Sequence, residues 1–172
     1  GTGLLLSPAD GGETWDQVPI SRVEDLWSVR FLSRERGFIV GEDGLILATV
    51  DGGREWVAQS SGTNRALLGL AVAPDSALAV GEKGTILRTE DFETWRVIES
   101  GTSETLNAIA RSGDACWAVG SRGATVGSTD RGRSWTPSPT VVSRDLMSVS
   151  MASPVAALAV GRRGAVQLLG PR

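Results

Sequence analysis

Apolar residues in this chain occur in short runs separated by Gly, Ser, Asp and Pro, and the runs show no helical period. One kind of run reads LWSV, LLGL, LNAI or LMSV, and the run after it ends in Val-Gly at Val40, Val80, Val119 and Val160. These Val-Gly pairs stand about 40 residues apart. The pattern therefore predicts short β-strands arranged in an internal repeat.

Each repeat contains two further strands. A GxxG turn follows every Val-Gly pair and leads to a third apolar run. A second turn, which ends in Trp, leads to the fourth run, and it reads DGGETW at Asp10, DGGREW at Asp51, DFETW at Asp91 and DRGRSW at Asp130. Four antiparallel strands in about 40 residues are typical of a β-propeller blade, and such blades are stable only when they stack and bury each other's faces.

The sequence predicts a single all-β domain, residues 1–172, with about 4.3 of these four-stranded repeats. It divides into a partial blade at 3–20, whole blades at 26–59, 67–99 and 106–138, and a partial blade at 146–169. Both partial blades contain a third strand, which favours an open arc or a fragment of a larger propeller over the alternative, a self-closed small ring. Open strand edges would also allow self-association.

The repeated Asp turn is either a chemical site or a structural device. Its carboxylate can accept hydrogen bonds from its own backbone, its Gly suits a positive φ, and its Trp can fill the space between blades. Because the turn recurs in every unit, we interpret it as architecture, with the Trp residues in the core. The third copy is shorter and lacks both glycines, so we expect it to be the most distorted. The predicted structural residues are Asp10, Trp15, Asp51, Gly53, Trp56, Asp91, Trp95, Asp130, Gly132 and Trp135.

The composition restricts the chemistry open to the chain. Its 172 residues contain no His and no Tyr, which excludes the tyrosine nucleophile of sialidases, His-ligated zinc, and Ser–His–Asp or Cys–His catalysis. We therefore predict no catalytic residue, no metal and no cofactor. A glycosidase built on two of the 20 Asp and Glu side chains stays open. No apolar stretch is long enough to span a membrane.

Charge is distributed unevenly along the chain. The net charge of −3 argues against a nucleic-acid partner. Residues 1–110 carry 9 basic and 17 acidic side chains, whereas residues 111–172 carry 8 Arg and 3 Asp. In a propeller, the GxxG turns and the linkers between blades lie on one face. We therefore hypothesise a partner-docking patch of arginines on that face, the alternative being solvated turn residues. The patch comprises Arg65, Arg122, Arg144, Arg162 and Arg163.

The turn motif fits the Asp-box, or BNR, repeat, whose pattern is [ST]-x-D-x-G-x-[TSE]-W. Thr49, Asp51, Gly53 and Trp56 match it, and so does the copy at Asp130. The stretch SGTNRALLGLAVAPDSALAVGEKGTILRTED resembles the repeat of the photosystem II stability/assembly factor family. That resemblance implies a non-catalytic, seven-bladed propeller that is exported to a periplasm or lumen, or secreted, and that helps to assemble membrane complexes.

From this resemblance we predict a non-catalytic binding or assembly module that docks a protein or peptide, such as a membrane-complex subunit, on the GxxG face. The alternative is a fragment of a carbohydrate-active or carbohydrate-binding Asp-box propeller, which exposed aromatic side chains would mark. Only Trp27 and Trp117 lie outside the Asp boxes, in strands that we expect to be buried. A purely structural array within a larger protein is a third interpretation.

Overall fold

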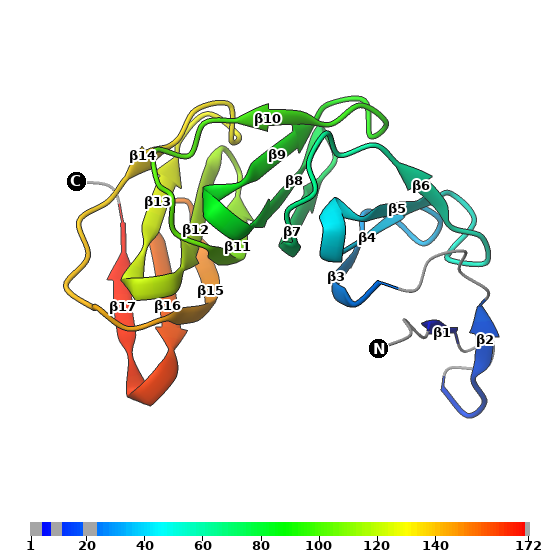
Figure 1. Ribbon diagram of the computed structural model, residues 1–172, viewed down its shortest axis with the longest axis horizontal. Helices are drawn as coiled ribbons and strands as arrows, with labels where there is room; N and C mark the ends of the chain where they lie inside the picture. The colour runs from blue at the N-terminus through cyan, green and yellow to red at the C-terminus, as the bar shows by residue number, and fades with distance from the viewer. Residues whose placement is uncertain (1–4, 8–11, 19–23, 171–172) are drawn as a thin grey trace.

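The computed structural model describes residues 5–7, 12–18 and 24–170. Its sheets stand side by side in an open arc, with the N-terminal and C-terminal sheets at opposite ends (Figure 1). Strands run from the inner side of the arc outward in chain order, and every pairing is antiparallel. The predicted all-β propeller and its open form are thus confirmed, and this chain does not form the self-closed ring.

Three sheets have four strands, and the two at the ends have fewer. The N-terminal pair is β1 (Leu5–Ser7) and β2 (Asp16–Val18). The first complete sheet contains β3 (Leu26–Phe31), β4 (Gly37–Gly41), β5 (Ile46–Thr49) and β6 (Val57–Gln59). The second contains β7 (Leu67–Ala73), β8 (Ser76–Gly81), β9 (Ile86–Thr89) and β10 (Arg96–Ile98).

The third complete sheet contains β11 (Leu106–Ser112), β12 (Ala115–Gly120), β13 (Thr125–Ser128) and β14 (Thr136–Pro137). The last sheet has three strands, β15 (Leu146–Ser153), β16 (Ala156–Gly161) and β17 (Val166–Leu169). A single 3-10 turn joins the second and third strands of each of these four sheets. These turns are η1 (Glu42–Gly44), η2 (Glu82–Gly84), η3 (Ser121–Gly123) and η4 (Arg162–Gly164).

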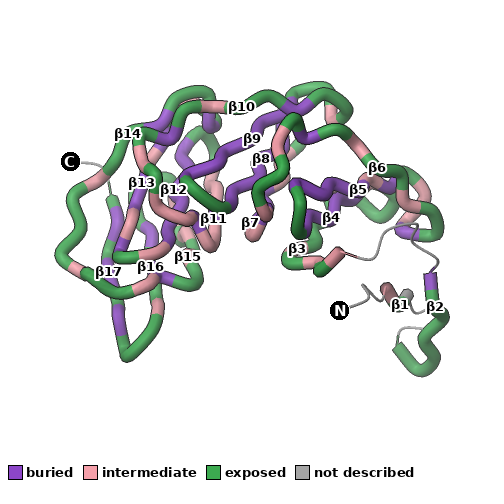
Figure 2. Tube along the Cα trace, viewed as in Figure 1, coloured by how far each residue is buried: buried purple, intermediate pink, exposed green. Residues whose placement is uncertain are grey.

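The core lies between neighbouring sheets rather than within any one of them. Leu78, Val80 and Ile86 of the second sheet are inaccessible to solvent and form one cluster with Leu106 and Trp135 of the third. Figure 2 shows buried residues along the middle strands of the arc and exposed ones at its outer turns. Burying a large aliphatic side chain contributes about 1.5–3 kcal/mol, so stacking of the sheets supplies most of the hydrophobic stabilisation.

The Asp-box tryptophans differ in burial, and the expectation that all four belong to the core is wrong for Trp15. Trp95 and Trp135 are 7% and 8% exposed, Trp56 is partly buried, and Trp15 is 57% exposed. The reason is that each indole packs against the sheet before its own: Trp95, for example, meets Phe38 edge-on at 5.7 Å. In the described part of the chain, no sheet precedes β1 and β2 to cover Trp15.

Trp27 is also exposed, at 51%, although we expected its strand to be buried. The register between β3 and β4 shifts between Leu26 and Ser28, so Trp27 is the extra residue of a β-bulge. Trp117, in contrast, is 9% exposed and packs against the last sheet. Burial along the inner strands thus depends on the bulge as well as on the alternation of side chains.

Candidate functional site

The four 3-10 turns occupy equivalent places, between the second and third strands of successive sheets, and the side of the arc that bears them is called here the turn face. Each turn begins with a backbone N–H that donates to the carbonyl just before the inner strand of its sheet, as Glu42 N does to Asp25 O at 2.9 Å. The preceding Gly41 is required because a Cβ there would stand 2.3 Å from Asp25 O. The equivalent bond from Arg162 N to Asp145 O is also 2.9 Å. The repeated Val-Gly therefore fixes every turn in the same orientation.

The middle residue of each turn has a left-handed backbone, which directs its side chain away from the sheet. Asp43, Lys83, Arg122 and Arg163 have φ between 50° and 53°, a region that few non-glycine residues occupy. All four side chains are exposed. Each turn thus exposes the side chain of its middle residue at the same place in every sheet.

The linkers between sheets pack against these turns and complete the face. Ser61 Oγ donates to Thr63 O at 3.0 Å, and a Cβ on Gly44 of η1 would stand 2.1 Å from that same carbonyl. Ser100 and Thr102 repeat this arrangement against η2. Turn and linker are therefore in close contact, and Arg65 and Arg144 on the linkers lie beside the turns.

The structure gathers four of the five predicted arginines around Asp145. The Asp145 carboxylate accepts the backbone N–H of Arg122 at 3.0 Å and lies 3.7 Å from Arg162 Nε. Arg144 Nη1 donates to the carbonyl of Arg163 at 2.9 Å. Arg65 lies elsewhere on the same face, where its guanidinium contacts Thr85 Oγ1 at 3.4 Å. All five arginines are exposed.

Sequence reasoning missed the acids within this group. Arg122 forms an ion pair with Glu104 of the preceding linker, and Asp145 faces Arg162. Among the described residues, Arg144 and Arg163 are therefore the members of this group whose guanidinium has no acidic partner. Asp145 directly follows Arg144 in the sequence and indicates an acid within the patch, because a linker residue beside η4 must lie close to the side chains of that turn.

The Asp-box carboxylates are engaged by their own turns. Asp130 Oδ1 accepts the hydroxyl of Ser128 at 2.7 Å and the backbone N–H groups of Arg133 and Ser134, both at 2.9 Å. Partial burial raises the pKa of Asp130, but the hydrogen bonds from Ser134 and Ser128 outweigh it and lower the pKa to about 2. Asp51 has the same arrangement, and hydrogen bonds from Glu55 N–H and Thr49 lower its pKa. Asp10 lies outside the described residues.

The two long copies of the box also fix their indoles. Gly132 has φ of 77° and its N–H donates to Ser128 Oγ at 2.9 Å, while its carbonyl accepts Trp135 Nε1 at 3.1 Å. Gly53 has the same role between Thr49 and Trp56, at 2.9 and 3.1 Å. Each glycine therefore joins the Ser or Thr that opens the box to the Trp that closes it.

The short third copy replaces the missing glycine with a residue from the neighbouring sheet. Trp95 Nε1 donates to Gln59 Oε1 at 2.8 Å, and Gln59 Nε2 donates to the carbonyl of Phe92 at 2.9 Å. Phe92 itself has φ of 63°, which is costly for a bulky side chain. Its ring stacks on Phe38 at 6.2 Å and lies under the Arg36 guanidinium at 5.4 Å, and these contacts offset the strain.

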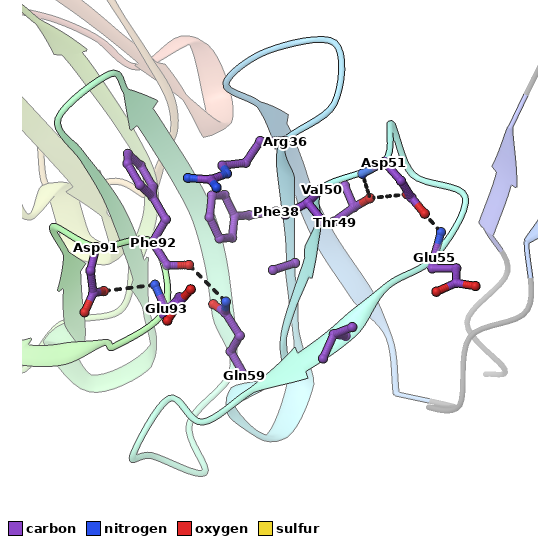
Figure 3. Close-up of a pocket in the computed structure, with 12 residues that line it drawn as sticks. Arg36, Phe38, Thr49, Val50, Asp51, Glu55, Gln59, Asp91, Phe92 and Glu93 are labelled. Carbon is purple, nitrogen blue, oxygen red and sulfur yellow. Dashed lines mark hydrogen bonds between the residues drawn. The ribbon is translucent and has the colours of Figure 1, made fainter.

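A hollow of about 180 Å³ lies between the second and third boxes, and Asp51 and Asp91 both line it. Figure 3 shows the two carboxylates on opposite sides of the hollow, each bonded to its own turn. A pair of carboxylates acting as acid and base must face a shared substrate. The hydrogen bonds of Asp51 and Asp91 are thus directed to their own turns rather than across the hollow.

Two further observations concern the described part of the chain alone. No helix there has the length and hydropathy of a membrane-spanning segment. Across residues 5–7, 12–18 and 24–170, no three His, Cys, Asp or Glu side chains are placed to hold a metal ion.

A family model described as "Photosynthesis system II assembly factor YCF48" matches residues 1–116. The chain belongs to this family. The resemblance of the Asp-box repeat to photosystem II assembly factors is thereby confirmed. The matched residues end in β12, so they include η1 and η2 but neither η3 nor η4.

Individual relatives in this family match over short stretches. The rice photosystem II stability/assembly factor HCF136 (Oryza sativa subsp. japonica) is 38% identical over 52 residues, which is 29% of this chain and 12% of the rice protein. The photosystem II assembly lipoprotein Ycf48 of Synechocystis is 46% identical over 50 residues, 27% of this chain and 14% of that protein.

Solved structures share the fold over most of the chain. YCF48 bound to a D1 peptide has a TM-score of 0.69 and 18% identity, covering 86% of this chain and 50% of that one. YCF48 from Cyanidioschyzon merolae has a TM-score of 0.67 and 23% identity, covering 91% and 56%. An ancestral GH74 enzyme has a TM-score of 0.70 at 10% identity, with 93% and 27% coverage. The chain thus spans about half the length of the YCF48 structures.

Proposed function

We propose that this YCF48-family chain is a non-catalytic module that docks a protein or peptide partner, such as a subunit of a membrane complex, on the face formed by η1 to η4. The observation that carries the proposal is the group of exposed arginines held around Asp145 beside rigid turns. Arginine forks bind carboxylates through two parallel hydrogen bonds, so the group suits an acidic segment or a C-terminal carboxylate. A related protein of the same fold has been solved with a D1 peptide.

The test is to measure binding of a D1 peptide and of a synthetic Glu-rich peptide by fluorescence polarisation. The triple variant Arg122→Glu, Arg162→Glu, Arg163→Glu should weaken binding at least tenfold, about 1.4 kcal/mol, because attraction becomes repulsion. The matched control reverses three exposed arginines away from the four turns, Arg34, Arg54 and Arg96, with the same change in net charge. Equal losses in both triples, or no loss in the first, would refute the docking patch.

A second candidate, a carbohydrate-binding propeller, is favoured by one observation. Trp15 and Trp27 expose 57% and 51% of their surface, and sugars stack on exposed indoles. The GH74 enzyme shares the fold, and one fold can carry unrelated functions in different proteins. A glycan array separates the candidates: we expect no glycan bound, and glycan binding that Trp27→Ala removes would favour this second function instead.

We further propose an extracytoplasmic location for the parent protein. The support is that the Synechocystis relative is named a lipoprotein and the rice relative chloroplastic. An alkaline phosphatase fusion to the parent reading frame should be active in a bacterial host, since that enzyme needs an oxidising compartment for its disulfides. Activity only after cell lysis would contradict the proposal.

We also propose that a second copy can associate with the open C-terminal edge. Strand β17 lacks the fourth strand that β13 has in β14, and Val166 and Leu168 beside that edge are 57% and 82% exposed. An unpaired, apolar edge strand promotes pairing with another chain. Light scattering should give a mass above that of the 18.0 kDa monomer, and Val166→Lys with Leu168→Lys should restore the monomer. A monomer before substitution would refute this proposal.

A further inference from the structure

The four 3-10 turns carry a gradient of charge along the arc. At the first two positions of each turn, η1 has two acids, η2 one acid and one base, η3 one arginine, and η4 two arginines. The sums are −2, 0, +1 and +2. The turns are structurally equivalent, so the gradient lies along one continuous row of side chains rather than on unrelated surfaces. The residues, in order, are Glu42, Asp43, Glu82, Lys83, Ser121, Arg122, Arg162 and Arg163.

Ion pairs neutralise part of the charge in this row, and they include the one between Arg162 and Asp145 at its η4 end. Arg122 is paired with Glu104, and the Glu82 carboxylate accepts the backbone N–H of Ala66 at 3.3 Å. In the described part of the chain, the side chains of Glu42 and Asp43 make no hydrogen bond or ion pair with other residues, and the Arg163 guanidinium is unpaired. The face therefore has a negative pole at η1 and a positive pole at η4.

The two poles are far enough apart to act separately. They lie on the first complete sheet and on the last sheet, with two sheets between them, and packed sheets lie about 10 Å apart. Charges in water are screened over about 8 Å at physiological salt. A partner that met only the positive pole would leave the negative pole without a counter-charge, and an acidic partner long enough to reach η1 would be repelled there.

We infer that the face recognises a bipolar segment, an extended peptide whose basic residues lie over η1 and whose acidic residues or terminal carboxylate lie over η4. This inference rests on the proposed docking function and adds the order of charges in the partner. The negative pole would thus select the partner's orientation, since opposite charges attract at one end and like charges repel at the other.

The test compares two synthetic peptides of equal length. One has three lysines, a Gly-Ser spacer and three glutamates; the other replaces the lysines with serines. We expect the bipolar peptide to bind the unaltered protein about threefold to tenfold more tightly, because exposed charge pairs contribute modestly. Lengthening the spacer should raise the affinity to a maximum and then lower it, as for any two linked contacts.

Glu42→Gln with Asp43→Asn should abolish the advantage of the bipolar peptide while leaving the acidic peptide bound. Asn tolerates the left-handed backbone at position 43, so the turn should persist. The matched control, Glu55→Gln with Glu93→Gln, removes two exposed acids away from the row of turns and should preserve the advantage. An advantage that survives Glu42→Gln with Asp43→Asn, or is absent from the unaltered protein, overturns the bipolar inference alone. Failure of both peptides to bind overturns the docking function as well.

Discussion

The same position in four successive sheets is buried three times and exposed once. Phe38, Leu78 and Trp117 stand two residues before the second-strand Val-Gly pair and are 0%, 0% and 9% exposed, whereas Leu158 at the equivalent point is 42% exposed. The first three insert into the sheet that follows, and β15 to β17 have no following sheet in this structure. An apolar side chain at this position therefore stabilises the fold only where it packs against a neighbouring sheet.

The largest predicted effect concerns the Asp-box indoles, which pack against the preceding sheet where one is present. Trp135→Ala should lower the free energy of unfolding by about 3–5 kcal/mol, because the ring leaves a cavity between the second and third complete sheets. Trp15→Ala should lower it by less than about 1 kcal/mol, since that ring is largely in water. Urea unfolding followed by circular dichroism measures both. Similar losses for the two would mean that Trp15 has a covering partner.

The next comparison uses the side chains two residues before the Val-Gly pair. Leu78→Ala should cost about 2–5 kcal/mol, whereas Leu158→Ala should cost about 1 kcal/mol or less, because 42% of the Leu158 surface is already exposed. The two residues have the same chemistry and the same strand position, so the difference isolates the neighbouring sheet. If Leu158→Ala proved as costly as Leu78→Ala in chemical denaturation, its face would have to be covered in solution.

A smaller effect is expected at the glycines of the boxes. Gly132→Ala would place a Cβ 2.7 Å from Leu78 in the preceding sheet and would also strain a backbone with φ of 77°. We expect a loss of about 2 kcal/mol or more. Gly12→Ala meets only Trp15 at 3.8 Å, so the backbone strain of about 1 kcal/mol should act alone. Thermal melts measure both variants, and equal decreases in Tm would contradict a contribution from the preceding sheet.

The smallest predicted effect depends on pH. The folded pKa of Asp130 is about 2, below its usual value of 3.8, so its carboxylate stabilises the fold above about pH 4 and that stability is lost as the pH falls toward 2. Asp130→Asn should therefore cost about 1 kcal/mol at pH 7, allowing for solvent screening, and the difference from the unaltered protein should vanish near pH 2. A pH-independent difference at Asp130 would contradict the electrostatic explanation.

The sequence determined the repeat and therefore the blade. Strand order, the Val-Gly turns and the hydrogen bonds of the two long Asp boxes are local, so a stretch of about forty residues contains the information for them. Only the tertiary structure decided which apolar residues are buried, because that depends on whether another sheet stands beside them: Trp135 and Trp15 occupy the same motif and differ completely in exposure. It also decided the charge of the candidate face, since the pairing of Arg122 with Glu104 and the position of Asp145 between two turns arise from contacts between blades that no single repeat encodes.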